Sequence, residues 1–161
     1  MDDDAFLPLQ GHETGPEVPR RIRQLYGLVE RVVQHAETEG LAKTTGMQAA
    51  ADSDGWGRYF QFGDSYVWLG VKFSLWASEA DTPIWFRFQN SALGRFREVS
   101  KAYSGWEIEQ RPRLIYDERN IPSFPIYLEY GMERDQLVEA IVGQIKSICA
   151  PLKRSPGHTL G

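Results

Sequence analysis

Few residues of this chain have the types and the spacing that catalysis or metal binding needs. The three histidines, His12, His35 and His158, lie far apart in the sequence, and Cys149 is the single cysteine. The sequence has no CxxC pair, no HExxH helix motif, no GxSxG nucleophile turn and no GxxxxGK phosphate loop. Because these motifs are absent, we predict no nucleophile, no metal site and no cofactor. The sequence therefore favours a non-enzymatic protein, with an enzyme as the alternative.

Recognition is the chemistry that the sequence does offer, through aromatic and charged side chains on one side of a strand. In residues 66–76, YVWLGVKFSLW, every second residue is apolar. Because successive side chains of a strand point to opposite faces, the residues between the apolar ones share the other face. Neighbouring strands extend this candidate binding face, whose residues are Tyr66, Trp68, Lys72, Trp76, Trp85, Arg87, Tyr127 and Glu129.

The elements that must position this face follow from the spacing of the apolar residues. Steps of three and four residues predict helices at about 19–39, 91–103 and 133–149. Alternation predicts strands at 57–62, 66–76, 82–89, 113–118 and 123–130. The sequence therefore predicts an α+β fold with a mainly antiparallel five-stranded sheet, in the order helix, three strands, helix, two strands, helix, and with the helices packed on one face. Residues 41–56 have no clear period and are expected to form a connection.

The charge of the chain is concentrated at its start. Residues 1–20 carry the whole net charge of −4, and the remaining residues have equal numbers of acidic and basic side chains. We expect a flexible acidic arm over residues 1–18, a single domain over 19–151 and a tail over 152–161. A neutral domain has no broad positive field for nucleic acid, although a local basic strip is compatible with it.

The cellular compartment is predicted from what the sequence lacks. It shows no secretory signal and no apolar run of the roughly 18 residues that a membrane-spanning helix needs. A single cysteine is typical of a protein from a reducing compartment. We therefore expect a cytoplasmic protein with no membrane association.

The predicted binding face is too aromatic to be left in water. Its tryptophans and tyrosines would expose more than the few hundred Å² that soluble monomers usually leave open. Its cover is a loop of the chain itself, a second copy in a homodimer, or another molecule. Because Trp, Tyr and Arg are the preferred anchors of protein interfaces, the favoured interpretation is a non-enzymatic interaction module that contacts a protein partner or its own copy.

Two other interpretations use the same residues. Aromatic residues interleaved with Lys72 and Arg87 suit base stacking and phosphate contacts, which makes nucleic acid an alternative partner. A pocket around the same two cations would instead suit an aromatic small molecule with an anionic group, with Asp117 and Glu129 as counter-charges.

The order of the predicted elements over about residues 20–118 resembles the core of the PD-(D/E)XK nuclease-like fold. In that family an acidic residue on the second strand and an E-x-K motif on the third bind a divalent metal. In the third strand here, IWFRF, the glutamate position falls on Trp85 and the lysine position on Arg87. A tryptophan cannot ligate a hard cation such as Mg²⁺, so the resemblance implies a divergent, inactive domain that binds nucleic acid. An active form would be a metal-dependent hydrolase that depends on Asp64 or Asp81.

Overall fold

A computed structural model describes residues 17–44, 49–52, 54–89, 96–103, 112–117 and 119–152. Within these residues it has four helices and one antiparallel sheet of seven strands, in the order β1-β3-β4-β5-β7-β6, with β2 also paired to β3. The α+β class and the antiparallel sheet are confirmed. Most of the expected arm and nearly all of the expected tail lie outside the described residues.

The elements follow one another along the chain as α1 (Glu17–Thr38), β1 (Ala42–Lys43), β2 (Ala49–Asp52), β3 (Gly55–Phe62), β4 (Ser65–Lys72), α2 (Phe73–Ser78), β5 (Ile84–Phe88), α3 (Phe96–Tyr103), β6 (Ile115–Tyr116), β7 (Pro122–Ile126) and α4 (Arg134–Cys149). The five predicted strands correspond to β3, β4, β5, β6 and β7. The segment expected to be a connection contributes β1 and β2, which are too short for a period to be read from the sequence.

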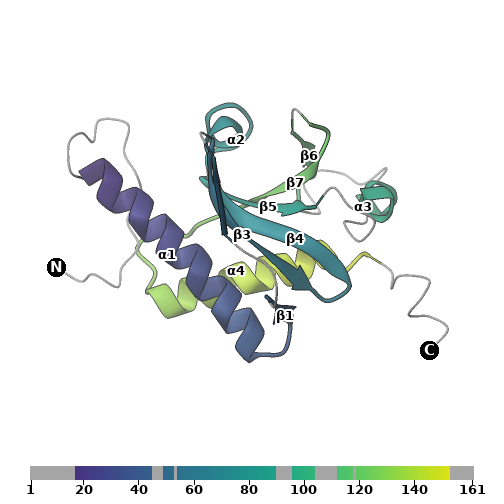
Figure 1. Ribbon diagram of the computed structural model, residues 1–161, viewed down its shortest axis with the longest axis horizontal. Coiled ribbons are helices and arrows are strands. Elements are labelled where there is room, and N and C mark those ends of the chain that lie inside the picture. The colour runs from purple at the N-terminus through teal and green to yellow at the C-terminus, as the bar shows by residue number, and fades with distance from the viewer. Residues whose placement is uncertain are drawn as a thin grey trace.

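One face of the sheet forms the hydrophobic core. Figure 1 shows α1 and α4 crossing below the sheet, on the side opposite α2 and β6. The strand residues of this core alternate along β3, β4 and β5 as the sequence predicts, and burying each such side chain contributes roughly 1.5–3 kcal/mol before entropy is counted. The buried strand residues in this core include Phe60, Val67, Leu69, Val71, Ile84, Phe86, Phe88, Phe124 and Ile126.

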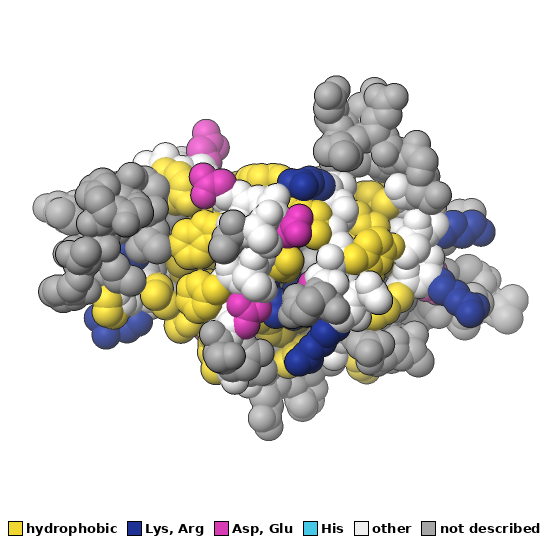
Figure 2. Space-filling model, turned by 90° about the horizontal axis from the view of Figure 1, so that it is seen from above, with side chains coloured by type: hydrophobic (Ala, Val, Ile, Leu, Met, Phe, Trp, Pro, Cys, Tyr) yellow, Lys and Arg dark blue, Asp and Glu magenta, His cyan; other side chains and the backbone are white. Residues whose placement is uncertain are grey.

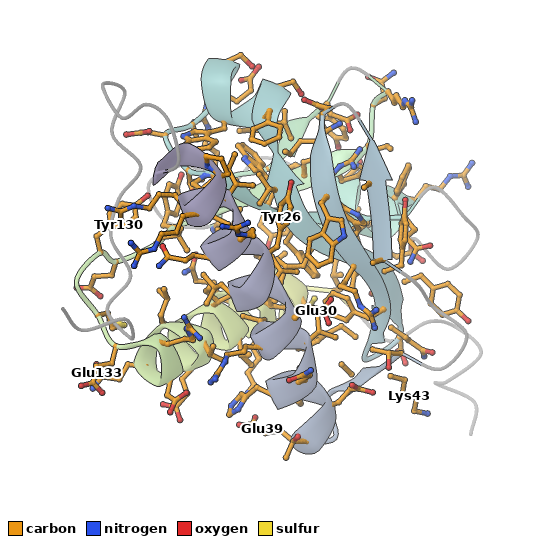
Figure 3. The ribbon with its side chains drawn as sticks, turned by 60° about the vertical axis from the view of Figure 1, so that its left-hand side comes forward. Tyr26, Glu30, Glu39, Lys43, Tyr130 and Glu133 are labelled. Atoms are coloured by element: carbon orange, nitrogen blue, oxygen red, sulfur yellow. The ribbon has the colours of Figure 1, made fainter. Side chains whose placement is uncertain are left out.

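The start of β3 also faces α1, which extends the contact between helix and sheet. The ring of Trp56 lies 4.8 Å from that of Tyr26, and Arg58 Nε lies 3.3 Å from Glu30 Oε1. Figure 3 shows Tyr26 and Glu30 on the side of α1 that faces the strands. The helix thus packs on the sheet through aromatic and charged groups as well as aliphatic ones.

The strand predicted over residues 66–76 ends at Lys72, and α2 takes its last residues. The backbone N–H of Phe73 donates to the Asp54 carbonyl at 2.9 Å, and the N–H of Ser74 donates to Asp54 Oδ1 at 2.8 Å. Asp54 therefore satisfies N–H groups that the first turn of a helix leaves without intrahelical partners. As a result Trp76 lies on a helix, where it stacks on Phe73 with ring centroids 6.4 Å apart.

The end of the core near α3 is closed by one tyrosine. Tyr103 packs on Phe124, with ring centroids 5.0 Å apart, and its hydroxyl donates to the Ile148 carbonyl of α4 at 2.7 Å. Across the described residues, none of the helices combines the length and the apolar character required to cross a membrane.

Candidate binding site on the outer sheet face

The candidate site lies on the outer face of the sheet, defined as the face opposite α1 and α4 (Figure 1). The strand register decides which side chains meet there: Trp68 on β4 pairs with Tyr59 on β3 and with Arg87 on β5. Figure 2 looks onto this side of the molecule and shows hydrophobic side chains gathered in patches beside Lys, Arg and other polar side chains. Two of the predicted binding residues, Trp68 and Arg87, thus share a face, as the alternation predicts, and the register makes them neighbours.

Part of the outer face is closed by the protein itself. Trp85 is 0% exposed, and its indole Nε1 donates a 2.9 Å hydrogen bond to the Thr82 carbonyl. The alternation places Trp85 on the expected face, since it pairs with Gly70, but burial removes it from any contact surface. A cover provided by the chain was one of the three covers expected for this face.

Lys72 also belongs to the closed part, where it forms an ion pair. The residue is 8% exposed, and its Nζ lies 2.7 Å from Asp54 Oδ2, which also accepts a hydrogen bond from Ser74 Oγ. Burial by itself would raise the pKa of Asp54, but hydrogen bonds from Lys72 and Ser74, with the positive charge of Lys72, hold this pKa below its ordinary value. Lys72 and Asp54 therefore fasten the end of β4 to the start of α2.

The open part of the outer face contains a pocket of about 310 Å³, here called the Trp68 pocket. The two pocket residues on β3 and β4 differ in access, because Tyr59 is 36% exposed and Trp68 is 6% exposed. The indole of Trp68 fits there because its neighbours lack side chains: a Cβ on Gly70 would lie 2.7 Å from Trp68 Cη2. The residues that line the Trp68 pocket are Tyr59, Trp68, Arg87, Phe88, Gln89, Arg119 and Ile121.

Arg87 is held in place by contacts on two sides. Its guanidinium carbon lies 5.2 Å from the centroid of the Trp68 ring, and Nη2 donates to Asp117 Oδ2. The Asp117 side chain is fully buried, and its other oxygen accepts the backbone N–H groups of Arg119 and Ile121 at 2.8 and 3.0 Å. The pocket wall is therefore fixed before any ligand arrives. Asp117 is thus the counter-charge of Arg87, as the small-molecule interpretation predicts.

The other predicted binding residues lie away from the pocket or touch it through the backbone. Tyr66 accepts the N–H of Gln89 on its carbonyl at 2.9 Å. Tyr127 and Glu129 follow the end of β7 and are exposed, and the Tyr127 backbone is bonded to the side chain of Gln144 on α4. Of the eight predicted residues, the structure thus brings Trp68 and Arg87 into the pocket.

Sequence reasoning missed Arg119 and Ile121, which come from the turn between β6 and β7. This turn contains Asn120 at φ 60°, a backbone conformation that asparagine tolerates better than most residues. The sequence DERN, which runs from the end of one predicted strand toward the next, contains the signal for a turn. Alternation, however, does not predict where the side chains of a turn lie, so it could not place Arg119 in the same pocket as Trp68.

The acidic residues that a metal-dependent enzyme would need are not gathered together. Asp64 lies in the turn between β3 and β4, whereas Asp81 lies just before β5, at the opposite end of β4. Burial, with a smaller effect from the charge of Asp81, raises the pKa of Tyr130, which lies beyond β7. No group of three or more His, Cys, Asp or Glu side chains within the described ranges could hold a metal ion.

The comparisons with known proteins find no significant match to this chain among family models, curated proteins or solved structures.

Proposed function

We propose that this protein is a non-enzymatic recognition module that binds its partner through the Trp68 pocket. The observation that carries the proposal is the arrangement of Arg87, which stacks beside Trp68 and is held by the buried Asp117. A binding surface whose side chains are already fixed loses little conformational entropy when a partner docks. The pocket volume of about 310 Å³ also falls in the range of small ligand sites.

The side chains of the pocket favour a planar group next to an anionic group. The exposed ring of Tyr59 and the indole of Trp68 offer aromatic surface. The exposed Arg119 offers positive charge beside Arg87, whose own charge is balanced by Asp117. A protein segment supplies this combination where an acidic residue adjoins an aromatic one, whether the segment belongs to another protein or to a second copy. A nucleotide supplies it through its base and its phosphate.

The resemblance to the nuclease-like fold supports the nucleotide as the second candidate. The elements that carry the resemblance are α1, β3, β4, β5, α3 and β6. The positions of the family glutamate and lysine fall on the buried Trp85 and on Arg87 in the pocket wall. Such a domain would bind a nucleic acid without cleaving it.

The test is a nuclear magnetic resonance titration of the ¹⁵N-labelled protein with two probes. One probe is a short peptide with aspartate next to phenylalanine, and the other is thymidine monophosphate. We expect at least one probe to shift the indole signal of Trp68 and the backbone signals of residues 87–89 and 119–121. The Trp68 signal is assigned with Trp68→Phe.

Matched substitutions make the titration specific to the pocket. Arg119→Gln with Tyr59→Ser should weaken the binding of the probe, because both exposed side chains line the pocket. Arg23→Gln with Tyr127→Ser removes one exposed arginine and one exposed tyrosine elsewhere and should leave binding unchanged. If neither probe shifts these signals, or if both double variants behave alike, the proposed function is wrong.

A further inference from the structure

We propose that the Trp68 pocket is one of two adjoining subsites for a single strand of nucleic acid. This inference rests on the proposed function and names the class of its ligand. The second subsite is a shallow hollow of about 510 Å³ between α3 and the β6–β7 turn, here called the α3 hollow. Its lining residues are Phe96, Arg97, Ser100, Lys101, Tyr116 and Asn120.

The two subsites share one ridge, formed by the turn between β6 and β7. Residues alternate across this ridge: Arg119 and Ile121 line the Trp68 pocket, whereas Tyr116 and Asn120 line the α3 hollow. The described residues of the ridge are held together, because the N–H of Asn120 donates to the Asp117 carbonyl at 2.9 Å and the N–H of Asp117 donates to the Ile121 carbonyl at 3.2 Å. A ligand that fills both subsites must therefore cross Arg119 and Asn120.

Both subsites repeat the same pair of chemical features. Each has an exposed tyrosine, Tyr59 in one and Tyr116, 45% exposed, in the other. Each also has basic side chains at its margin, Arg119 in the first and Arg97 with Lys101 in the second, all three exposed. Tyr116 is also oriented, because its hydroxyl lies 2.5 Å from Ser100 Oγ.

A single strand of nucleic acid matches this repeat, because its rings alternate with phosphates along the chain. Stacking of bases on aromatic side chains, with cations along the backbone, is the usual design of proteins that bind single strands. An acidic peptide would use the same cations, but it needs no second ring-binding hollow across a basic ridge. The chain is neutral after residue 20, so the attraction comes from this local cluster and is screened readily by salt.

The test measures the fluorescence anisotropy of a labelled strand of about ten thymidines as the full-length protein is added. We expect binding that weakens between about 50 and 200 mM salt, with a slope of log K against log salt of about −2 if three cations contact phosphates. Arg97→Gln with Lys101→Gln should reduce the magnitude of this slope by about 1.4. Tyr116→Ala should weaken binding about tenfold through the loss of one stacked base.

The control variants carry the same chemical changes away from the ridge. Arg23→Gln with Lys146→Gln removes two exposed cations from α1 and α4, and Tyr127→Ala removes an exposed tyrosine beyond β7. These variants should bind the strand with the affinity and the salt slope of the wild type.

The outcomes separate this inference from the proposed function. If thymidine monophosphate or the acidic peptide binds the Trp68 pocket while the strand does not bind, the inference is wrong and the proposed function stands. Strand binding that Tyr116→Ala leaves unchanged, or a duplex of the same length that binds equally well, would also overturn the inference. If neither the strand nor the two probes bind, both proposals fail.

Discussion

Asp54 links three parts of the chain through one carboxylate. It accepts hydrogen bonds from the backbone and the hydroxyl of Ser74 and forms an ion pair with Lys72. Because its pKa is lowered in the folded state, the unfolded chain binds the proton more tightly. The stabilisation is therefore complete above the ordinary pKa of 3.8, and it is lost as the pH falls through the lower folded pKa.

The charge of Asp54 can be tested with Asp54→Asn, since asparagine keeps an oxygen that can cap α2. We expect the variant to lose about 1 kcal/mol of unfolding free energy near pH 7, a modest value because water partly screens the ion pair. The difference from the wild type should shrink towards zero below the folded pKa of Asp54. Urea unfolding of the variant and the wild type, at pH 7 and at a pH below the folded pKa of Asp54, measures this difference. An equal loss of unfolding free energy at the two pH values would contradict this role for the carboxylate.

Glycine at position 70 is required by the crowding under Trp68. A Cβ there would lie 2.7 Å from Trp68 Cη2 and still closer to the backbone of Trp56 and Gly57. We expect Gly70→Ala to lower the unfolding free energy by about 3 kcal/mol, because backbone atoms must move to make room. The control is Gly143→Ala in α4, where a Cβ meets no atom within 4 Å. It should instead stabilise the helix by about 1 kcal/mol, as measured by the same denaturation.

At the scale of elements, the β6–β7 hairpin depends on Asp117. The hairpin has two paired positions, Ile115 with Ser123 and Tyr116 with Pro122, so its ladder is short. The buried carboxylate adds contacts to two backbone N–H groups of the turn and to Arg87 on β5. This single side chain therefore ties the ridge of the candidate site to the sheet.

We expect Asp117→Asn to cost about 3 kcal/mol of unfolding free energy, because Arg87 would keep its charge without a carboxylate in a largely buried place. Asp135→Asn is the matched control: it breaks the exposed pair between Arg31 and Asp135, whose charged atoms lie 3.3 Å apart. Surface pairs of this kind contribute less than about 1 kcal/mol. Chemical denaturation compares the two variants, and similar losses of unfolding free energy would show that Asp117 does not stabilise the hairpin.

The sequence predicts elements best where one period runs for several turns or residues. α1, β3, β5 and α4 repeat their apolar residues clearly, and the structure forms each near its predicted range. Alternation extends the predicted strand to residue 76 because Phe73 and Leu75 are two apart, but a single pair is too short to establish a period. What selects the helix is Asp54, about twenty residues earlier, and a local pattern contains no such contact.

The same limit applies to the candidate site. Alternation places Trp68, Trp85 and Arg87 on the correct face, and register then brings Trp68 beside Arg87. Alternation does not tell what lies over a face, so the burial of Trp85 could not be predicted. Arg119 reaches the pocket through a turn whose geometry depends on Asp117, which is again a contact between distant elements.

For the molecule as a whole, the edges of the sheet matter as much as its faces. One side of the sheet ends in the short strands β1 and β2, and the other ends in β6, which covers the start of β7. Past the end of β7, Gln144 of α4 bonds the N–H and the carbonyl of Tyr127 at 2.9 and 2.8 Å. A helix side chain thus occupies backbone groups that a strand of another molecule could otherwise pair with.

We expect Gln144→Val to free these groups and to promote association of the protein through this edge. The variant should lose about 1 kcal/mol of stability and scatter more light on heating at high concentration. Gln136→Val changes an exposed glutamine of the same helix and is the control for the change in helix propensity. Equal scattering by the two variants would show that Gln144 does not protect the edge.

The sealed indole of Trp85 has a practical consequence for following how this molecule opens. Its N–H proton is bonded to Thr82 and no part of the ring is exposed, so this proton can exchange with deuterium from the solvent only when this part of the fold opens. The disappearance of the Trp85 indole resonance in heavy water would therefore time that opening.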